Sequence, residues 1–244
     1  MKELEIKKFI SLVKKPFAYF IDFLLPNSCI NCGKEIDHEL ICHNCLELLS
    51  YPRSPLCPHC GRPIDKTKTC IFCKDEKNLD YGRAFLLYLP PVDKMIHHLK
   101  YRGKPKLAKF FGLGMATVLK SDFYLKEADF LVSVPLFWWK KARRTYNQAE
   151  LLSVIVHQET SIPFVDALKR VKNTRTQTRL DQEKRLKNVN NAFRLKNGIE
   201  VKDKTIILID DVMTTGATIK ECAKVLKAAG AEKVYSLVAA ITTD

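Results

Sequence analysis

The 244-residue sequence lacks several features that would assign it to common protein classes. No uninterrupted apolar run reaches the roughly 18 residues that a transmembrane helix needs, so we expect no membrane-spanning helix. No basic segment, apolar segment and cleavage site of a signal peptide precede the first cysteine, which favours a reducing cytosol over export. The Walker A pattern G-x-x-x-x-G-K-[ST] and the Rossmann pattern G-x-G-x-x-G are also absent, which argues against those two nucleotide-binding classes.

Positive charge, in contrast, is present in excess. The formal net charge is +14 at pH 7. Residues 1–80 hold 12 Lys and Arg against 11 Asp and Glu, whereas residues 81–244 hold 29 against 16. An anionic partner, such as nucleic acid or a lipid surface, fits this balance, and the second part of the chain is where we expect it to bind.

The most informative stretch runs from Lys204 to Gly230. Thr205–Ile209 is the β-branched, apolar run of a buried parallel strand, which we expect to end at the acidic pair Asp210–Asp211. A polar loop follows, after which apolar residues at helical spacing predict a helix that ends at Gly230. A loop between a strand and a helix directs backbone N–H groups and the positive end of the helix dipole at one point, which suits a phosphate. Two carboxylates just before the loop suit a vicinal diol and a divalent ion, so a phosphorylated sugar fits this spacing.

Ile206–Thr218 closely resembles the phosphoribosyl pyrophosphate (PRPP) motif of type I phosphoribosyltransferases, in which apolar residues precede two acids and a T-T-G loop. The resemblance implies that Asp210 and Asp211 hold the ribose hydroxyls, that Met213–Thr218 wrap the 5′-phosphate, and that Mg²⁺ accompanies PRPP. The plain alternative is a strand, turn and helix with ordinary capping residues. The predicted PRPP-binding residues are Asp210, Asp211, Val212, Met213, Thr214, Thr215, Gly216, Ala217 and Thr218.

Eight of the nine cysteines form four C-x-x-C pairs, and the last two pairs repeat the first two 28 residues later. This spacing indicates an internal duplication. Four thiolates complete a closed tetrahedral Zn²⁺ shell, so we predict two structural zinc sites, with sequential pairing favoured over a cross-braced one. The predicted ligands are Cys29, Cys32, Cys42 and Cys45 for the first site, and Cys57, Cys60, Cys70 and Cys73 for the second.

Within the first 27 residues, residues 4–25 follow a broadly helical apolar pattern with lysines between the apolar positions, and Pro16 should break or kink it. Two interpretations stay open. The segment covers the apolar flank of a neighbouring domain, or it is a basic amphipathic helix that lies on an anionic membrane. The sequence thus divides into an N-terminal helix (1–27), a tandem zinc-ribbon module (28–78) and a larger α/β domain (79–244).

Strand and helix patterns alternate in the larger domain. The predicted strands cover residues 83–89, 128–135, 164–171, 205–209 and 233–241, and the predicted helices include Val92–Tyr101 and Lys106–Leu119. The last strand, helix and strand should form a right-handed β-α-β unit. Because ligands of open α/β sheets bind beyond the carboxyl ends of the strands, the loop after Val134 should face the same crevice as Asp210–Thr218.

Several basic stretches contain aromatic residues and could follow a phosphate backbone while a ring stacks on a base. Solvated helix faces give a similar pattern, and that alternative stays open. The long polar connection after Val171 is either a mobile lid or a nucleic-acid arm. The candidate phosphate or DNA contacts are Lys100, Tyr101, Arg102, Lys104, Lys140, Arg143, Arg144, Arg175 and Arg185.

With the PRPP motif and the cysteine framework, three further blocks resemble the ComF family of competence proteins. They are residues 96–112 (IHHLKYRGKPKLAKFFG), residues 134–152 (VPLFWWKKARRTYNQAELL) and the spacing from Arg170 to Phe193, and the resemblance covers nearly the whole chain. It implies a type I phosphoribosyltransferase-like α/β domain, with a mostly parallel sheet flanked by helices, after a small cysteine-rich double zinc ribbon.

The resemblance also implies a function. It describes a cytoplasmic protein, associated peripherally with the inner membrane, that handles incoming single-stranded DNA during natural transformation beside a helicase-like partner and a DNA-loading protein. The alternative is an active phosphoribosyltransferase that transfers a phosphoribosyl group from PRPP to an unidentified base, for which the sequence offers no convincing general base. A zinc-ribbon transcription factor would leave Ile206–Thr218 without a use.

Overall fold

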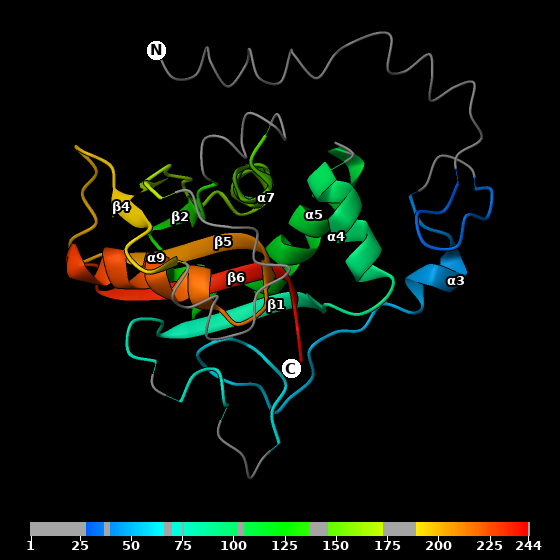
Figure 1. The fold of residues 1–244 in the computed structure, drawn as a ribbon, viewed down its shortest axis with the longest axis horizontal. Coiled ribbons are helices and arrows are strands. Elements are labelled where there is room, and N and C mark those ends of the chain that lie inside the picture. The colour runs from blue at the N-terminus through cyan, green and yellow to red at the C-terminus, as the bar shows by residue number, and fades with distance from the viewer. Residues whose placement is uncertain are drawn as a thin grey trace, which may run out of the picture. The chain divides into compact units, whose positions relative to one another are not determined.

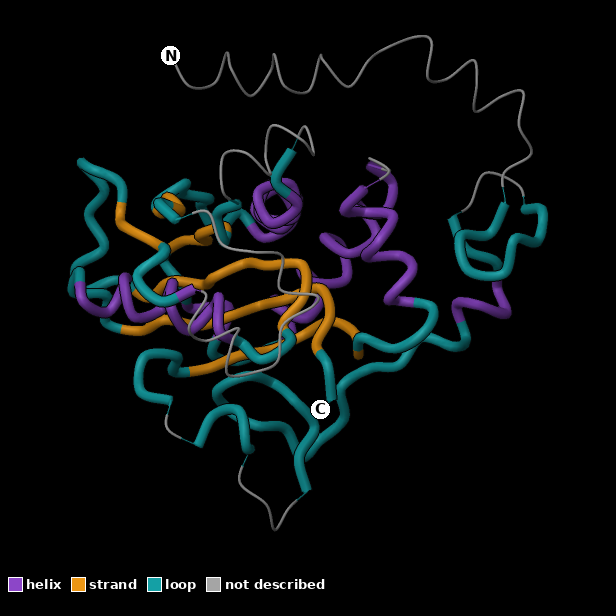
Figure 2. The backbone as a smooth tube through the Cα atoms, in the orientation of Figure 1, coloured by secondary structure: helices purple, strands orange, loops and turns teal. Residues whose placement is uncertain are grey.

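The computed structural model describes residues 28–36, 40–65, 70–74, 76–101, 105–136, 146–172 and 189–243 (Figures 1 and 2). By packing, the chain divides into two compact units, Met1–Leu48 and Leu49–Asp244. The described part of the first unit contains the first cysteine quartet and the short helix α3 (His43–Leu46). The module boundary predicted at residue 78 follows the cysteine repeat, whereas the division by packing falls after Leu48. The predicted N-terminal helix, residues 1–27, lies outside the described residues.

Strands and helices alternate through the second unit. In chain order, its described elements are β1 (Tyr81–Leu87), α4 (Val92–Tyr101), α5 (Pro105–Ser121), the 3-10 helix η1 (Leu125–Glu127), β2 (Phe130–Ser133), α7 (Gln148–Thr160), β3 (Leu168–Arg170), β4 (Phe193–Leu195), β5 (Thr205–Met213), α9 (Ala217–Ala228) and β6 (Lys233–Ile241). The predicted α/β class is confirmed, and most predicted elements agree with the observed ones to within a few residues at their ends.

Four of the described strands form one parallel sheet in the order β1-β6-β5-β2. The two central strands, β5 and β6, pair from Thr205↔Lys233 to Met213↔Ile241. Residues 206–209 of β5 and 234–241 of β6 are buried without a break, which explains why these parts read as nearly continuous apolar runs rather than as alternating patterns. Helices α5 and α7 pack on one face of the sheet and α9 packs on the other (Figure 1). The carboxyl ends of all four strands therefore meet at one edge, where ligands of such sheets bind.

Two of the predicted strand assignments were wrong. The strand beginning at Thr205 does not end before the acidic pair but continues through it to Met213. The segment 164–171 is not one strand, because Phe164 bridges Leu131 at the edge of the parallel sheet, whereas β3 pairs antiparallel with β4 in a separate ribbon. Between these pairings the backbone turns, with the Ala167 amide donating to the Val165 carbonyl at 2.9 Å.

Among the helices in the described part of the chain, none combines the length and the apolar character that crossing a bilayer requires.

The second cysteine quartet belongs to the same compact unit as the sheet, and its backbone covers the edge strand β1. The Gly82 amide donates to the Pro58 carbonyl, and the Leu87 amide donates to the Ser50 carbonyl, both at 2.8 Å. A Cβ atom on Gly82 would lie 2.6 Å from the carbonyl oxygen of His59, closer than real Cβ contacts. The ribbon can therefore lie flat on the strand only because position 82 carries no side chain.

This close approach makes Gly82→Ala a test of the contact between ribbon and strand. We expect the substitution to lower the free energy of unfolding by about 1–3 kcal/mol, since backbone atoms must move to admit the methyl group. Urea denaturation measures the change. Ser236→Ala is the matched control, because the Ser236 hydroxyl is buried at the same spot and has no hydrogen-bond partner among the described residues. The control should be neutral or slightly stabilising. Equal stability of Gly82→Ala and the parent would contradict the tight packing.

Candidate functional site

The predicted PRPP-binding residues occupy the end of β5, the connection after it and the start of α9. Residues 210–213 are the last four of the strand, residues 214–216 connect, and Ala217 and Thr218 open the helix. Gly216, the N-cap of α9, has a φ of 76°, in the left-handed region that favours glycine. The Thr215 hydroxyl accepts from the Ala217 amide at 3.4 Å. This geometry directs the positive end of a twelve-residue helix at the carboxyl edge of the sheet, as an anion-binding loop requires.

Two carboxylates stand directly before this loop. Asp211 is 7% exposed and Asp210 is half-buried. The Asp211 amide donates to Asp210 Oδ1 at 2.8 Å, which holds the two residues in a fixed relation. Desolvation, and then the charge of Asp211, raise the pKa of Asp210 to about 7. The site therefore carries, beside Asp211, an acid that titrates near neutral pH.

A lysine from another element forms an ion pair with Asp211. The ammonium of Lys100, in the last turn of α4, lies 2.9 Å from Asp211 Oδ1. The sequence had grouped this residue with candidate phosphate or DNA contacts on a basic stretch. The structure places it within the candidate site, on a helix separated from the acids by more than a hundred residues of sequence.

The start of α7 holds α4 and β2 in position at this edge. The Tyr146 hydroxyl donates to the Leu99 carbonyl, and Gln148 Nε2 donates to the Lys100 carbonyl at 3.4 Å. The Asn147 side chain donates to the Val134 carbonyl at 3.2 Å and accepts from the Ala149 amide, which caps α7. The segment after β2 therefore begins beside the acidic end of β5, with the Val134 amide bonded to the Ile209 carbonyl. Residues 137–145, most of the loop that the sequence placed at this crevice, lie outside the described residues.

Of the other candidate DNA contacts, Tyr101 lies within the described residues. Its side chain is 53% exposed, and its ring centroid lies 4.8 Å from that of His97 on the outer face of α4. The remaining candidates lie outside the described residues: Arg102, Lys104, Lys140, Arg143, Arg144, Arg175 and Arg185.

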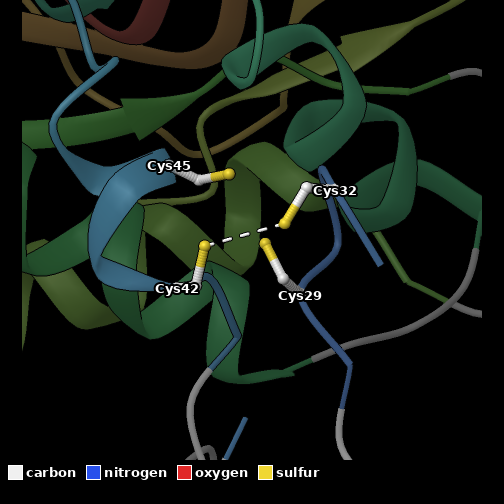
Figure 3. A group of neighbouring side chains, drawn as sticks. All are labelled: Cys29, Cys32, Cys42 and Cys45. Atoms are coloured by element: carbon white, nitrogen blue, oxygen red, sulfur yellow. Dashed lines mark hydrogen bonds between the residues drawn. The ribbon is translucent and has the colours of Figure 1, made fainter. Parts of the chain in front are cut away.

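The eight repeated cysteines gather in two quartets with the sequential composition that the duplication predicted. The first is Cys29, Cys32, Cys42 and Cys45 (Figure 3), and the second is Cys57, Cys60, Cys70 and Cys73. Within each quartet the Sγ atoms lie within 4.8 Å of one another, and no disulfide joins any of the described cysteines. Hydrogen bonds from Cys60 and Cys73 lower the pKa of Cys57, and the bond to Cys57 in turn raises that of Cys73. Such crowded thiols ionise together only around a cation, so both quartets fit Zn²⁺.

Residues to which the sequence assigned no role surround the second quartet. Arg62 is 1% exposed and donates to Cys60 Sγ at 3.7 Å. Glu76 and Lys220 form an ion pair between the ribbon and the first turn of α9. The duplication matches Arg62 with Lys34, but no sequence signal shows that only one of these side chains is buried.

Two family models match the chain, a double zinc ribbon domain over residues 20–74 and a phosphoribosyl transferase domain over residues 147–242. The fold, the strand–loop–helix site and the cysteine quartets thus define a phosphoribosyltransferase-like domain combined with a double zinc ribbon. Competence protein F of Haemophilus influenzae is 32% identical over 218 residues, 84% of this chain and 93% of that protein. The chain belongs to the ComF family of competence proteins.

Two other relatives show the same extended similarity. DNA utilization protein YhgH of Salmonella typhimurium is 31% identical over 86% of this chain and 95% of that protein. Competence protein ComFC of Bacillus subtilis is 27% identical over 77% of this chain and 78% of that protein. Among solved structures, the glutamine PRPP amidotransferase of B. subtilis has a TM-score of 0.40 and 19% identity over 58% of this chain and 30% of that chain.

The raised pKa of Asp210 predicts a pH-dependent stability. The folded state retains the proton up to about pH 7, whereas the unfolded state loses it near pH 4. The unfolded state therefore binds fewer protons between these values, and the carboxyl group costs increasing stability as pH rises. We expect Asp210→Asn to melt roughly 2–4 °C above the parent at pH 8, and the difference to vanish near pH 4.

Asp129 provides a control of opposite sign. Its carboxylate accepts the Thr205 amide at 2.8 Å and pairs with Lys204, and the first of these bonds lowers its pKa. Its stabilisation is present above the unfolded-state pKa and is lost as pH falls through the folded-state pKa. Asp129→Asn should therefore lower the melting temperature at pH 8. Parallel effects of the two variants in calorimetric melts would contradict the assignment.

Proposed function

We propose that this protein takes part in DNA uptake during natural transformation, handling incoming single-stranded DNA and binding PRPP or a related phosphoribosyl ligand. The observation that carries the proposal is the acid pair, phosphate-type loop and lysine assembled at one sheet edge, in a chain whose relatives are named for competence and DNA utilization.

The donors at the sheet edge support a phosphoribosyl ligand. The N-terminus of α9 and the hydroxyls of Thr214, Thr215 and Thr218 suit the 5′-phosphate. The carboxylates of Asp210 and Asp211 suit the ribose hydroxyls, and oxygen donors of this kind also suit the Mg²⁺ that would accompany a pyrophosphate. The residues present therefore fit PRPP with Mg²⁺.

Charge and exposed aromatic rings support DNA as the partner. The basic surplus lies in residues 81–244. On the outer face of α4, the exposed rings of His97 and Tyr101 adjoin each other, and Lys94 is exposed on the same helix. Aromatic rings among cations suit single strands, in which bases are free to stack and phosphates attract positive charge.

Family membership supports the wider setting. We propose a cytoplasmic protein with peripheral contact at the inner membrane through residues 1–27, working beside a helicase-like competence partner and a DNA-loading protein. The basic amphipathic pattern of the N-terminal segment is the feature of this chain that fits an anionic lipid surface.

An active phosphoribosyltransferase is the second candidate function. The observation that favours it is the pKa of about 7 at Asp210, which supplies a group able to exchange a proton at neutral pH within the site. Release of pyrophosphate from PRPP in the presence of a nitrogenous base distinguishes this candidate from binding without turnover.

The phosphoribosyl site is tested by calorimetric titration with PRPP and Mg²⁺. The double variant Asp210→Asn and Asp211→Asn should bind PRPP roughly 100-fold more weakly or not at all, because both charge-assisted acceptors for the ribose are lost. Its zinc content should not change. Glu159→Gln, on the exposed side of α7, is the control and should bind as the parent does. Undiminished affinity in the double variant would remove the assignment.

Binding of DNA is tested by fluorescence anisotropy with a labelled single-stranded oligonucleotide. We expect affinity to fall steeply with salt, with a slope of about −0.7 per phosphate contact. Tyr101→Ala should weaken binding by about 1–3 kcal/mol through lost stacking. Phe123→Ala is the matched control. Phe123 is 64% exposed, but it precedes β2 and so lies toward the amino ends of the strands, whereas α4 follows the carboxyl end of β1. Equal losses in the two variants would refute α4 as the stacking surface.

A further inference from the structure

The second cysteine quartet shares one hydrophobic core with the candidate phosphate loop. Cys57, Cys60, Cys70 and Cys73 are all buried in the cluster that also contains Met213 and Ala217, the residues on either side of the loop. The quartet is therefore packed as part of the domain that holds the site. Two polar connections link it to the two ends of the loop.

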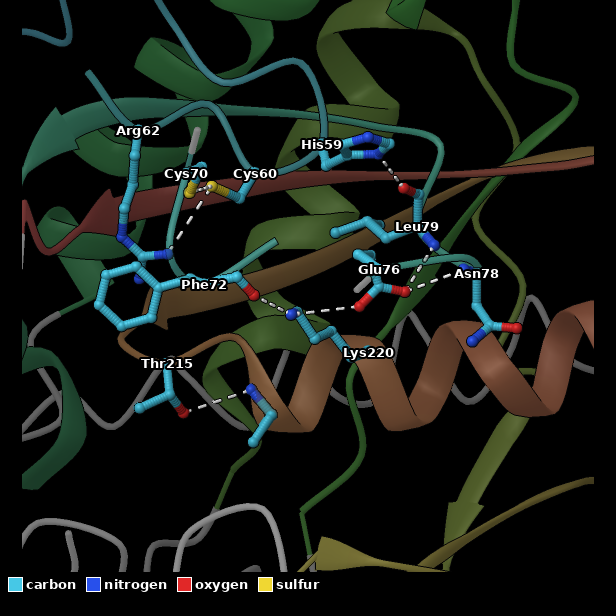
Figure 4. Close-up of polar contacts among 11 residues, drawn as sticks. His59, Cys60, Arg62, Cys70, Phe72, Glu76, Asn78, Leu79, Thr215 and Lys220 are labelled. Atoms are coloured by element: carbon cyan, nitrogen blue, oxygen red, sulfur yellow. Dashed lines mark hydrogen bonds and ion pairs between the residues drawn. The ribbon is translucent and has the colours of Figure 1, made fainter. Parts of the chain in front are cut away.

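The first connection runs through Arg62 to the strand end before the loop. Its guanidinium donates to Cys60 Sγ at 3.7 Å and, through Nε, to the Thr242 carbonyl at 2.8 Å. Its Cζ atom also lies 3.9 Å from the ring centroid of Phe72, a residue between Cys70 and Cys73 in the sequence (Figure 4). The Thr242 amide donates to the Met213 carbonyl at 3.1 Å. One buried side chain thus joins a metal-ligand sulfur to the residue directly before the loop.

The second connection runs through Lys220 to the first turn of α9, after the loop. Its ammonium lies 3.2 Å from Glu76 Oε2 and also donates to the Phe72 carbonyl (Figure 4). The Lys220 amide donates to the Gly216 carbonyl at 2.9 Å, so this residue takes part in the first helical bond of α9. The side chain of Glu76 is 5% exposed and accepts the Asn78 amide at 2.9 Å, which fixes it within the ribbon.

The first half of the duplication shows the contrast. Lys34, the counterpart of Arg62, is exposed to solvent. Its quartet belongs to the other compact unit, Met1–Leu48. Two sequence repeats that each fit a zinc ion have therefore acquired different surroundings, and only the second is built into the domain of the candidate site.

We propose that the second cysteine quartet positions the phosphate loop, and that Arg62 and Lys220 are the positioning residues that connect them. Zinc bound by the quartet fixes Cys60, and through it the guanidinium of Arg62. The ion pair with Glu76 holds Lys220 toward the ribbon, so this lysine acts on the geometry of the loop and does not bind the phosphate. The effect on PRPP affinity rests on the proposed function, whereas the effect on the loop does not.

The test compares the order of the loop in solution. Hydrogen exchange of the amides of residues 214–218 is measured in the zinc-loaded full-length protein, its Lys220→Met variant and the control Lys224→Met, one turn further along α9. We expect exchange to rise roughly tenfold in Lys220→Met and to be restored by Lys220→Arg, which retains the charge for Glu76. Lys224 is exposed, so its variant should exchange as the parent does. Unchanged exchange in Lys220→Met would overturn the proposal.

Calorimetric titration with PRPP and Mg²⁺ gives a second measurement. We expect Arg62→Met and Lys220→Met to raise Kd about tenfold, while Lys34→Met leaves it unchanged. Glu76→Gln separates positioning from direct binding. The glutamine side-chain oxygen can still accept the backbone amides of Asn78 and Leu79, as Glu76 does, whereas the negative charge that holds Lys220 is lost. Positioning predicts weaker binding in Glu76→Gln, whereas a lysine that contacts the phosphate directly would bind more tightly once released, which would overturn the proposal.

The connection should also act in the reverse direction, because coupling between two binding sites is reciprocal. Saturating PRPP and Mg²⁺ should slow the transfer of one of the two zinc ions to a chromogenic chelator about tenfold and leave the other unaffected. Equal slowing of both, or of neither, would contradict the proposal where PRPP binds. If the parent does not bind PRPP, the proposed function fails, and the exchange measurement alone decides the positioning role.

Discussion

Like charges at the end of a buried strand are costly, and the arrangement of the carboxyl edge follows from that cost. Asp210 and Asp211 are adjacent in β5, where burial and the charge of Asp211 penalise the charged form of Asp210. One response is protonation, seen in the raised pKa of the first acid. The other is a counter-ion, which Lys100 supplies from α4 at 2.9 Å. The contacts from the start of α7 fix α4 in turn, so three segments distant in sequence converge on two carboxyl groups.

Local patterns in the sequence were sufficient for most of the fold. The apolar runs at the two central strands, the helical spacing after the T-T-G loop and the cysteine repeat each depend on neighbouring residues. They could not reveal the pairing of Lys100 with Asp211, or of Arg62 with Thr242, because these contacts form only when the sheet brings distant segments together. The extent of β5 was missed for a related reason: pairing with β6 continues past the polarity change at Asp210.

The two ribbons show how a duplicated unit can keep its ligands and change its surroundings. Both quartets retain four thiolates in one small volume, as closed zinc shells require. Gly61 has positive φ like its counterpart Gly33, but a Cβ on Gly61 would meet the Gly82 backbone at 2.7 Å, whereas one on Gly33 would meet nothing within 4 Å. Packing on the edge strand has therefore added a steric demand to a turn that already needed glycine.

The order of strands in the sheet also governs when the domain can form during synthesis. Strand β6 is the last of the described strands to leave the ribosome, yet it lies between β1 and β5. Until it emerges, the earlier strands cannot join into one sheet, and Arg62 lacks its acceptor at Thr242. A nascent chain that has made β5 but not β6 can already pack its ribbon on β1, yet it lacks the strand that joins β1 to β5. Completion of the sheet and of the connection from the ribbon to the phosphate loop therefore depends on the same strand.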